Sequence, residues 1–253
     1  MREQHAWLNG ISLEDVHPRL LLQHIEEGEL QMDVRTGDRA GAPGLFVTEA
    51  KPKQRDIMIT FAIRERLDFE TRAAAVSAVS AWARSGGWLE LSTRPGLRLW
   101  VTPTGFPDVG RPRDWTRDIT LTLTAYAWPL WTETSPNTAA LTGVTSGSAY
   151  VSAPGSWETV LEAEITPTSA TLTSAEITVG SQTLTLTGLS VASGTALKIY
   201  WDERHLLHIE AGGVGLLGKR TGDDIILTPG RHEVEVTFST ACDVQLMARG
   251  CYL

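Results

Sequence analysis

The sequence predicts a mainly β protein of two domains, of which the first carries one α-helix and the second is built only from strands. Three observations predict it: short runs of alternating apolar and polar residues, a single stretch with helical periodicity, and an abrupt change of composition near residue 132. The chain has 253 residues, of which 42% are hydrophobic, which suits two ordinary globular domains. We therefore expect domains at residues 1–132 and 133–253.

The first domain is expected to contain a strand, a helix and a hairpin in that order. Residues 57–63 are apolar at every second position, which predicts a strand with one buried face. Asp68 is a good N-cap for the helix that follows, and residues 86–87 are glycines that would end it. The helical repeat predicts that its core-facing residues are Phe69, Ala73, Val76, either Val79 or Ser80, and Ala83. Residues 88–91 and 97–101 are then expected to pair as a hairpin.

A long connection, residues 102–117, joins this hairpin to a strand at residues 118–125, where apolar residues alternate with Thr. Apolar anchors combined with arginines are favoured at protein interfaces. The connection could pack back on its own domain or dock on a neighbouring subunit, and both alternatives stay open. If it docks, the subunit-interface candidates are Phe106, Arg111, Arg113 and Trp115.

The second domain is expected to begin after a linker or leading loop at residues 132–140, where Pro and small polar residues replace large apolar ones. Only strand signals follow. The expected strands are residues 157–165, 175–179, 182–186, 196–201, 206–209, 224–227, 232–238 and 244–248. Short strands at this spacing predict an antiparallel β-sandwich.

Charge argues against a nucleic-acid binder. Residues 1–131 hold 16 Lys and Arg against 17 Asp and Glu, the remainder holds 6 against 13, and the sum is the net charge of −8. Tight, sequence-independent binding of nucleic acid needs clustered cations. Residues 118–197 contain no Lys or Arg at all. No apolar run approaches the ~20 residues that cross a bilayer, so we expect no membrane insertion and no secretory signal.

The sequence offers no catalytic or metal-binding signature, and we expect no cofactor. His205, His208 and Glu210 lie close together, but on a strand His205 would point away from the other two. The glycine-rich residues 212–218 lack the Lys-Ser/Thr that completes a phosphate loop. Two cysteines near the C-terminus, Cys242 and Cys251, match neither a disulfide framework nor a zinc pattern.

Trp157 and Trp201 have two interpretations. Tryptophan is buried on average, which favours a place in the core of the sandwich. Exposed aromatic rings on a sandwich can instead stack on sugars, so these two residues are the glycan-stacking candidates.

The order of elements from Arg55 to Trp131 resembles the N-terminal domain of the siphophage distal tail protein family. The resemblance rests on a strand beginning Arg55-Asp56-Ile57, an Ala-rich helix ending in Trp82, the segment Gly87-Trp88-Leu89-Glu90-Leu91, and a Thr-alternating strand that closes near Trp128-Pro129. Residues 7–13 are similar to the opening strand of such tail proteins. Residues 197–202 and 228–234 resemble the galectin-like sandwich often appended to them.

The resemblance implies a fold and a structural, non-enzymatic function. The fold is an N-terminal β-barrel or sandwich-like domain with one α-helix, followed by a C-terminal galectin-like antiparallel β-sandwich. The implied protein forms a ring, commonly hexameric, between the tail tube protein and a tail-associated lysin or fibre hub protein. It would be assembled in the host cytoplasm, lie at the tail tip of the virion and let DNA pass without specific binding. The alternative is a carbohydrate-binding module for host surface glycans.

Overall fold

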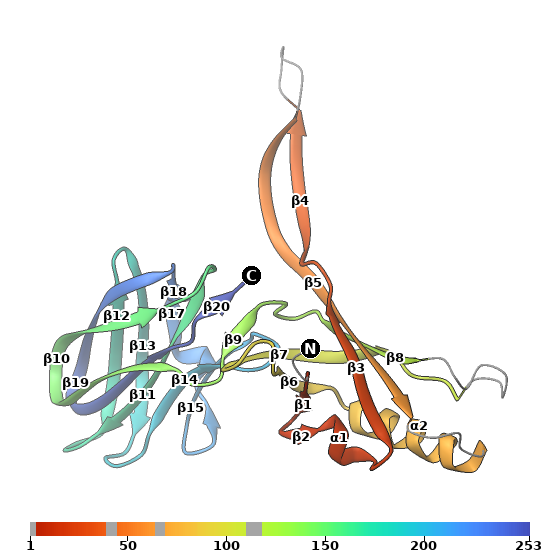
Figure 1. Cartoon of the computed structure of the whole chain (residues 1–253). Helices are drawn as coiled ribbons and strands as arrows, with labels where there is room; N and C mark the ends of the chain where they lie inside the picture. Colours follow the sequence, from red (N-terminus) through yellow and green to blue (C-terminus); the bar gives the residue numbers. More distant parts are fainter. Residues whose placement is uncertain (1–3, 39–44, 64–68, 110–117) are drawn as a thin grey trace. The chain divides into compact units, whose positions relative to one another are not determined.

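The computed structural model describes residues 4–38, 45–63, 69–109 and 118–253. The chain forms two compact units, Met1–Trp131 and Thr132–Leu253, which are treated separately below (Figure 1). The mainly β fold predicted from the sequence is confirmed, because both units consist chiefly of antiparallel strands. Among the described residues, no helix has the length and apolar character needed to cross a membrane.

Unit 1 is organised around one antiparallel sheet with the strand order β2-β1-β6-β7-β8-β5-β3. Asn9 and Gly10, both with positive φ, form the two-residue turn between β1 and β2. The elements are β1 (Ala6–Leu8), β2 (Ile11–Ser12), α1 (Leu13–Val16), β3 (Leu20–Glu27), β4 (Gln31–Asp38), β5 (Leu45–Ile63), α2 (Phe69–Ala83), β6 (Gly87–Leu91), β7 (Leu97–Gly105) and β8 (Ile119–Ala125). The strand β9 (Trp131–Glu133) lies at the boundary of the units.

The core of unit 1 uses the alternation seen in the sequence, since Ile57, Ile59 and Phe61 of β5 are fully buried. The predicted face of α2 is partly wrong. Phe69 is 56% exposed, whereas Arg72 is 6% exposed and its Nε donates a hydrogen bond to the carbonyl of Val109, 2.8 Å away. This hydrogen bond gives the buried Nε–H group of Arg72 a partner. The buried face of α2 is therefore the one that carries Arg72 rather than Phe69. The predicted N-cap, Asp68, lies outside the described residues.

Strand β5 is much longer than the predicted strand at residues 57–63. Its second half pairs with β3 and β8 inside the sheet, and its first half pairs with β4. Residues 31–38 and 45–54 thus form a two-stranded ribbon, here called the arm. Figure 1 shows the arm projecting from the sheet of unit 1.

Unit 2 is an antiparallel sandwich with the strand order β16-β15-β14-β11-β19-β12-β13-β17. Its own apolar core runs from Val151 to Ala248. The elements are β10 (Asn137–Ala153), β11 (Thr159–Pro167), β12 (Leu172–Val179), β13 (Gln182–Val191), β14 (Leu197–Trp201), β15 (Leu207–Ala211), β16 (Val214–Gly215), the 3-10 helix η2 (Leu217–Lys219), β17 (Arg220–Gly222), β18 (Ile226–Leu227), β19 (Gly230–Ala248) and β20 (Cys251–Tyr252).

Two features of unit 2 differ from the prediction. The strands expected at residues 232–238 and 244–248 are one continuous strand, β19, which pairs with β12 in its first half and with β11 in its second. The loop expected at residues 132–140 ends in the start of β10, which pairs along β19. Strand β10 was not predicted because register shifts between residues 141 and 146 interrupt its alternation and several inward-facing residues, such as Ala139, are small.

Candidate functional site: the arm of unit 1

The arm has two chemically different faces. Residues directly opposite each other in an antiparallel ladder share a face, and the register pairs Met32 with Pro52 and Val34 with Ala50. An irregularity at residue 48 then brings Val47 opposite Thr36, on that same face. The alternation of side chains adds Leu45 to the set. This face of the arm is therefore mainly apolar, and its two polar members, Thr36 and Asp38, lie opposite Val47 and Leu45.

This apolar face has no cover among the described residues. Met32 is 37% exposed, Val34 47%, Val47 61% and Leu45 63%, although large apolar side chains are normally placed where the fold can bury them. An isolated two-stranded ribbon is at best marginally stable in water. A contiguous apolar surface on such an element is typical of an interaction site.

The opposite face of the arm is charged. The carboxylate of Glu49 forms ion pairs with Arg35, at 3.3 Å, and with Lys51. Near the end of this face the ring of Phe46 lies over Gly37, where a Cβ atom would come within 2.7 Å of the ring. The charged face is thus internally paired and suited to water, which leaves the apolar face as the one that needs a partner.

A polar network fixes the arm where it leaves the sheet. The amide of Gly28 donates to the carbonyl of Asp56 at 2.7 Å, and the side chain of Asp56 accepts a 2.6 Å hydrogen bond from the buried hydroxyl of Thr124. These bonds join the segment between β3 and β4 to β5, and β5 to β8. The direction of the arm is therefore set by hydrogen bonds to two strands of the sheet.

Charged side chains also make contacts at the base of the arm. Glu27, the last residue of β3, forms an ion pair with Arg94 at 2.9 Å, and the guanidinium of Arg94 lies over the ring of Trp131. Arg55 is 4% exposed, and burial together with the positive charge of Arg94 lowers the pKa of its guanidinium, an effect that Glu27 partly offsets. Glu27 is thus the anion shared by two arginines at the base of the arm.

Of the four interface candidates in the connection at residues 102–117, the structure describes one, Phe106. Phe106 follows the end of β7 and is 51% exposed. Arg111, Arg113 and Trp115 lie outside the described residues. The carbonyl of Val109 is bound by Arg72 of α2, so this part of the connection packs on its own unit. The role of these four residues at a subunit interface stays a prediction.

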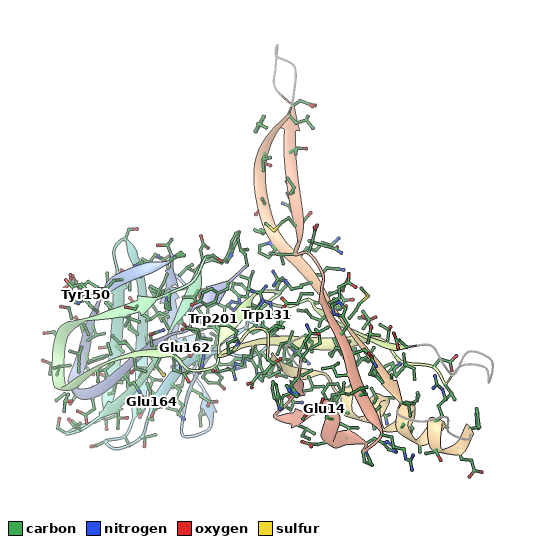
Figure 2. All side chains as sticks on the ribbon, in the orientation of Figure 1. Glu14, Trp131, Tyr150, Glu162, Glu164 and Trp201 are labelled. Atoms are coloured by element: carbon green, nitrogen blue, oxygen red, sulfur yellow. The ribbon has the colours of Figure 1, made fainter. Side chains whose placement is uncertain are left out.

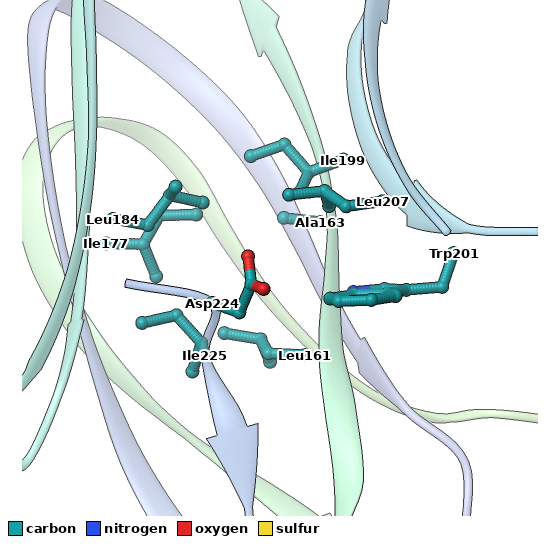
Figure 3. A pocket seen from close by; sticks show the side chains of 9 residues that line it. All are labelled: Leu161, Ala163, Ile177, Leu184, Ile199, Trp201, Leu207, Asp224 and Ile225. Carbon is teal, nitrogen blue, oxygen red and sulfur yellow. The ribbon is translucent and has the colours of Figure 1, made fainter. Parts of the chain in front are cut away.

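The two glycan-stacking candidates are both half-buried. The amide of Trp157 donates to the carbonyl of Cys251 at 3.1 Å. Trp201 lines a small apolar cavity together with Leu161 and Asp224 (Figure 3), and the edge of its ring packs against His205. The free volume of this cavity is ≈ 10 Å³, about the space of one water molecule. It therefore has no room for a sugar, and stacking on an outer ring surface stays a prediction.

A wider, open groove of ≈ 430 Å³ runs along β15. Its lining includes His208, Glu210 and Arg220 but neither of the two tryptophans. His205 lies in the turn before β15, and His208 forms a 3.1 Å contact with Asp202 rather than with Glu210. The described residues contain no group of His, Cys, Asp and Glu arranged to hold a metal ion.

Sequence reasoning did not find the arm. The sequence signal for its two strands is weak. Met32 and Val34 alternate with charged residues over four residues only, and Pro52 interrupts the partner strand. The short apolar run Leu45-Phe46-Val47 could have indicated a strand. It could not have shown that the strand leaves its sheet.

No family model and no curated protein matches the chain. Solved structures do match it. The SPP1 Dit protein, described as a paradigm of the hub adsorption apparatus in phages that infect Gram-positive bacteria, aligns over 100% of both chains with a TM-score of 0.70 and 14% identity. A chain of the phage P2 baseplate, in its activated conformation with Ca, aligns over 99% of this chain and 98% of its own with a TM-score of 0.57 and 10% identity. The corresponding structure with Sr aligns over 98% of both chains with a TM-score of 0.57 and 9% identity. At these identities the likeness shows a shared fold over the whole chain.

Proposed function

We propose that this chain is a structural protein of a phage tail tip, that it forms a ring, commonly of six copies, and that it catalyses no reaction. Two independent lines support the proposal. The fold matches that of a hub protein from end to end. The chain also carries an arm whose apolar face is not covered by any residue that the structure describes in its own unit.

The uncovered apolar face of the arm is the main observation in favour of a ring. A closed ring needs heterologous contacts, in which one surface of a subunit meets a different surface of the next. An arm that projects from the sheet supplies the first surface, because its apolar side chains are exposed among the described residues and gain from burial against a partner. A second copy is the partner always present where this chain is made.

The ring would join the tail tube protein to the tail-associated lysin or fibre hub protein, and DNA would pass through its lumen. A polyanion slides through a channel when the wall holds few cations. Residues 1–131 carry 16 positive and 17 negative side chains, a near-neutral balance that suits such a wall. Assembly would take place in the host cytoplasm before the tail is completed.

Light scattering and negative-stain imaging of the purified chain test this function. We expect a concentration-dependent assembly of about six copies with a central hole, and its attachment to the end of tubes made by the tail tube protein. A chain that stays monomeric at high concentration, both alone and with the tube protein, would overturn the proposal.

A further inference from the structure

A buried arginine lies on β5 where the arm joins the sheet. Arg55 precedes the fully buried residues Ile57 and Ile59 at the same two-residue spacing, so it belongs to the core side of the strand. It is only 4% exposed, and its Nε–H group has no hydrogen-bond partner among the described residues. A buried cation without a hydrogen-bonded anion is costly, because it has given up its hydration.

A second buried donor lies close to the same group of charges. Trp131, labelled in Figure 2, is fully buried, and its Nε1–H group also lacks an acceptor in the part of unit 1 that the structure describes. The guanidinium of Arg94 lies over the ring of Trp131, 5.5 Å from the ring centre. Burial, and after it the charge of Arg94, lowers the pKa of Arg55, so the two guanidinium groups interact. Both buried donors are therefore neighbours of Arg94.

Glu27 does not serve all of these groups. Its Oε2 accepts a hydrogen bond from Nε of Arg94 at 2.9 Å, and its Oε1 accepts one from the hydroxyl of Thr93 at 3.4 Å. Arg94 and Glu27 are the charged residues that act on Arg55, so two positive charges share one negative charge. One monovalent anion balances this local charge.

The burial of the donors limits the size of that anion. Arg55 and Trp131 are enclosed within a single chain, which favours a small ion over the side chain of a partner protein. The side chains of Arg94 and Glu27 are 34% and 22% exposed, so the solvent reaches the cluster from their side.

We propose that the base of the arm binds one small monovalent anion, chloride or a carboxylate of the size of acetate, between Arg55, Arg94 and the indole N–H of Trp131. The two arginines supply the charge, and Trp131 supplies a neutral donor. Charge-assisted hydrogen bonds to the anion offset the cost of burying these donors. The site lies within one copy and does not depend on the proposed ring.

An NMR titration of the ¹⁵N-labelled full chain tests the site. Sodium chloride, or in a parallel series sodium acetate, replaces sodium gluconate at constant ionic strength, and the bulky gluconate serves as the reference anion. We expect the Nε–H signal of Arg55 and the indole N–H signal of Trp131 to shift together and to saturate with one dissociation constant. Saturation by chloride alone assigns a halide site, and saturation by acetate as well assigns a site that also takes carboxylates.

The chain contains its own control for this titration. The indole N–H of Trp82 already donates to the carbonyl of Ile11 at 3.1 Å, so its signal should not move. The proposal is overturned if the signals of Arg55 and Trp131 move with neither salt, since water alone then binds the two donors. Shifts of equal size at Trp82 would overturn it as well.

A pair of arginine variants locates the anion. Arg55→Met removes one cation and its donors, and the titration of Trp131 should weaken about tenfold or more. Without chloride or acetate its thermal unfolding midpoint should not fall below that of the parent, because the substitution removes a buried charge. Arg35→Met removes the same charge from the charged face of the arm, where the side chain of Arg35 is 72% exposed, and should leave the titration unchanged.

Equal titrations of Trp131 in the parent and in Arg55→Met would overturn the assignment to Arg55. If Arg55→Met does not fold, the titration of the parent against Trp82 decides the question. A chain that binds the anion but forms no ring contradicts the proposed function and leaves this inference standing.

Discussion

Val47→Asp is the sharpest test of the idea that the arm works through its apolar face. Val47 is 61% exposed in the single chain, so replacing it disturbs little packing inside the arm. Full burial of an aliphatic side chain is worth about 2 kcal/mol, of which a partner that covers Val47 would add about 1 kcal/mol. A carboxylate at this position forfeits that gain and adds a desolvation penalty of roughly 2 kcal/mol or more.

Together these effects weaken each contact by at least about 3 kcal/mol, which corresponds to about 100-fold in the equilibrium constant. In a ring every subunit carries the substitution, so the concentration required for assembly rises steeply. We expect sedimentation velocity to show only monomer for Val47→Asp at concentrations where the parent chain assembles. The thermal unfolding midpoint should stay within a few degrees of the parent, because the core of unit 1 is untouched.

The matched control is Lys51→Gln, which changes the net charge by the same amount but on the charged face of the arm. The side chain of Lys51 is 70% exposed, and its ion pair with Glu49 is of the surface kind that contributes about 1 kcal/mol or less. This control should assemble like the parent. The reasoning is refuted if Val47→Asp and Lys51→Gln assemble at the same concentration as the parent chain.

Three further outcomes follow from the structure. Phe61→Ala, at a fully buried site of β5, should lower the free energy of unfolding of unit 1 by about 3–5 kcal/mol in urea titrations. Gly37→Ala would bring a Cβ atom within 2.7 Å of the ring of Phe46, so it should displace that ring and change the chemical shifts of the arm without altering the unfolding of unit 1. Burial raises the pKa of the Cys242 thiol to about 11, and this residue is fully buried, so it should stay unreactive towards thiol reagents at pH 8 until the protein is unfolded.

The parts of the fold that could be predicted from the sequence are those where a strand has one dry face. Residues 57–61 and 119–123 alternate strictly because every second side chain enters the core, and the burial of Ile57 and Leu121 follows. In strand β10 the alternation is broken by register shifts between residues 141 and 146, and several inward residues such as Ala139 are small, so the contrast between its two faces is weak in the sequence. The exposed Phe69 misled the assignment of the helix face, since the partner of Arg72 comes from a residue distant in sequence.

The candidate site lay beyond sequence reasoning for a different physical reason. Periodicity reports which side chains avoid water, but it does not report what covers them. In the arm, Met32 and Val34 alternate with charged residues as in a half-buried strand, yet no described residue of the unit covers them. The connection at residues 102–117 was singled out by its composition, and among its described residues Val109 accepts a hydrogen bond from Arg72 of the unit's own helix.

The base of the arm explains how an element of marginal stability can still act as a connector. A ribbon that swung freely would lose conformational entropy each time it docked, and this loss would oppose assembly. The hydrogen bonds from Gly28 and Thr124 to Asp56, together with the pairing of Glu27 and Arg94, confine the first residues of the arm before any partner arrives. Part of the ordering cost is thus met during folding, and the apolar face of the arm is already aimed when a second copy approaches. The polar residues at the base therefore fix the direction of the arm, and the apolar residues along the arm supply the affinity for a second copy.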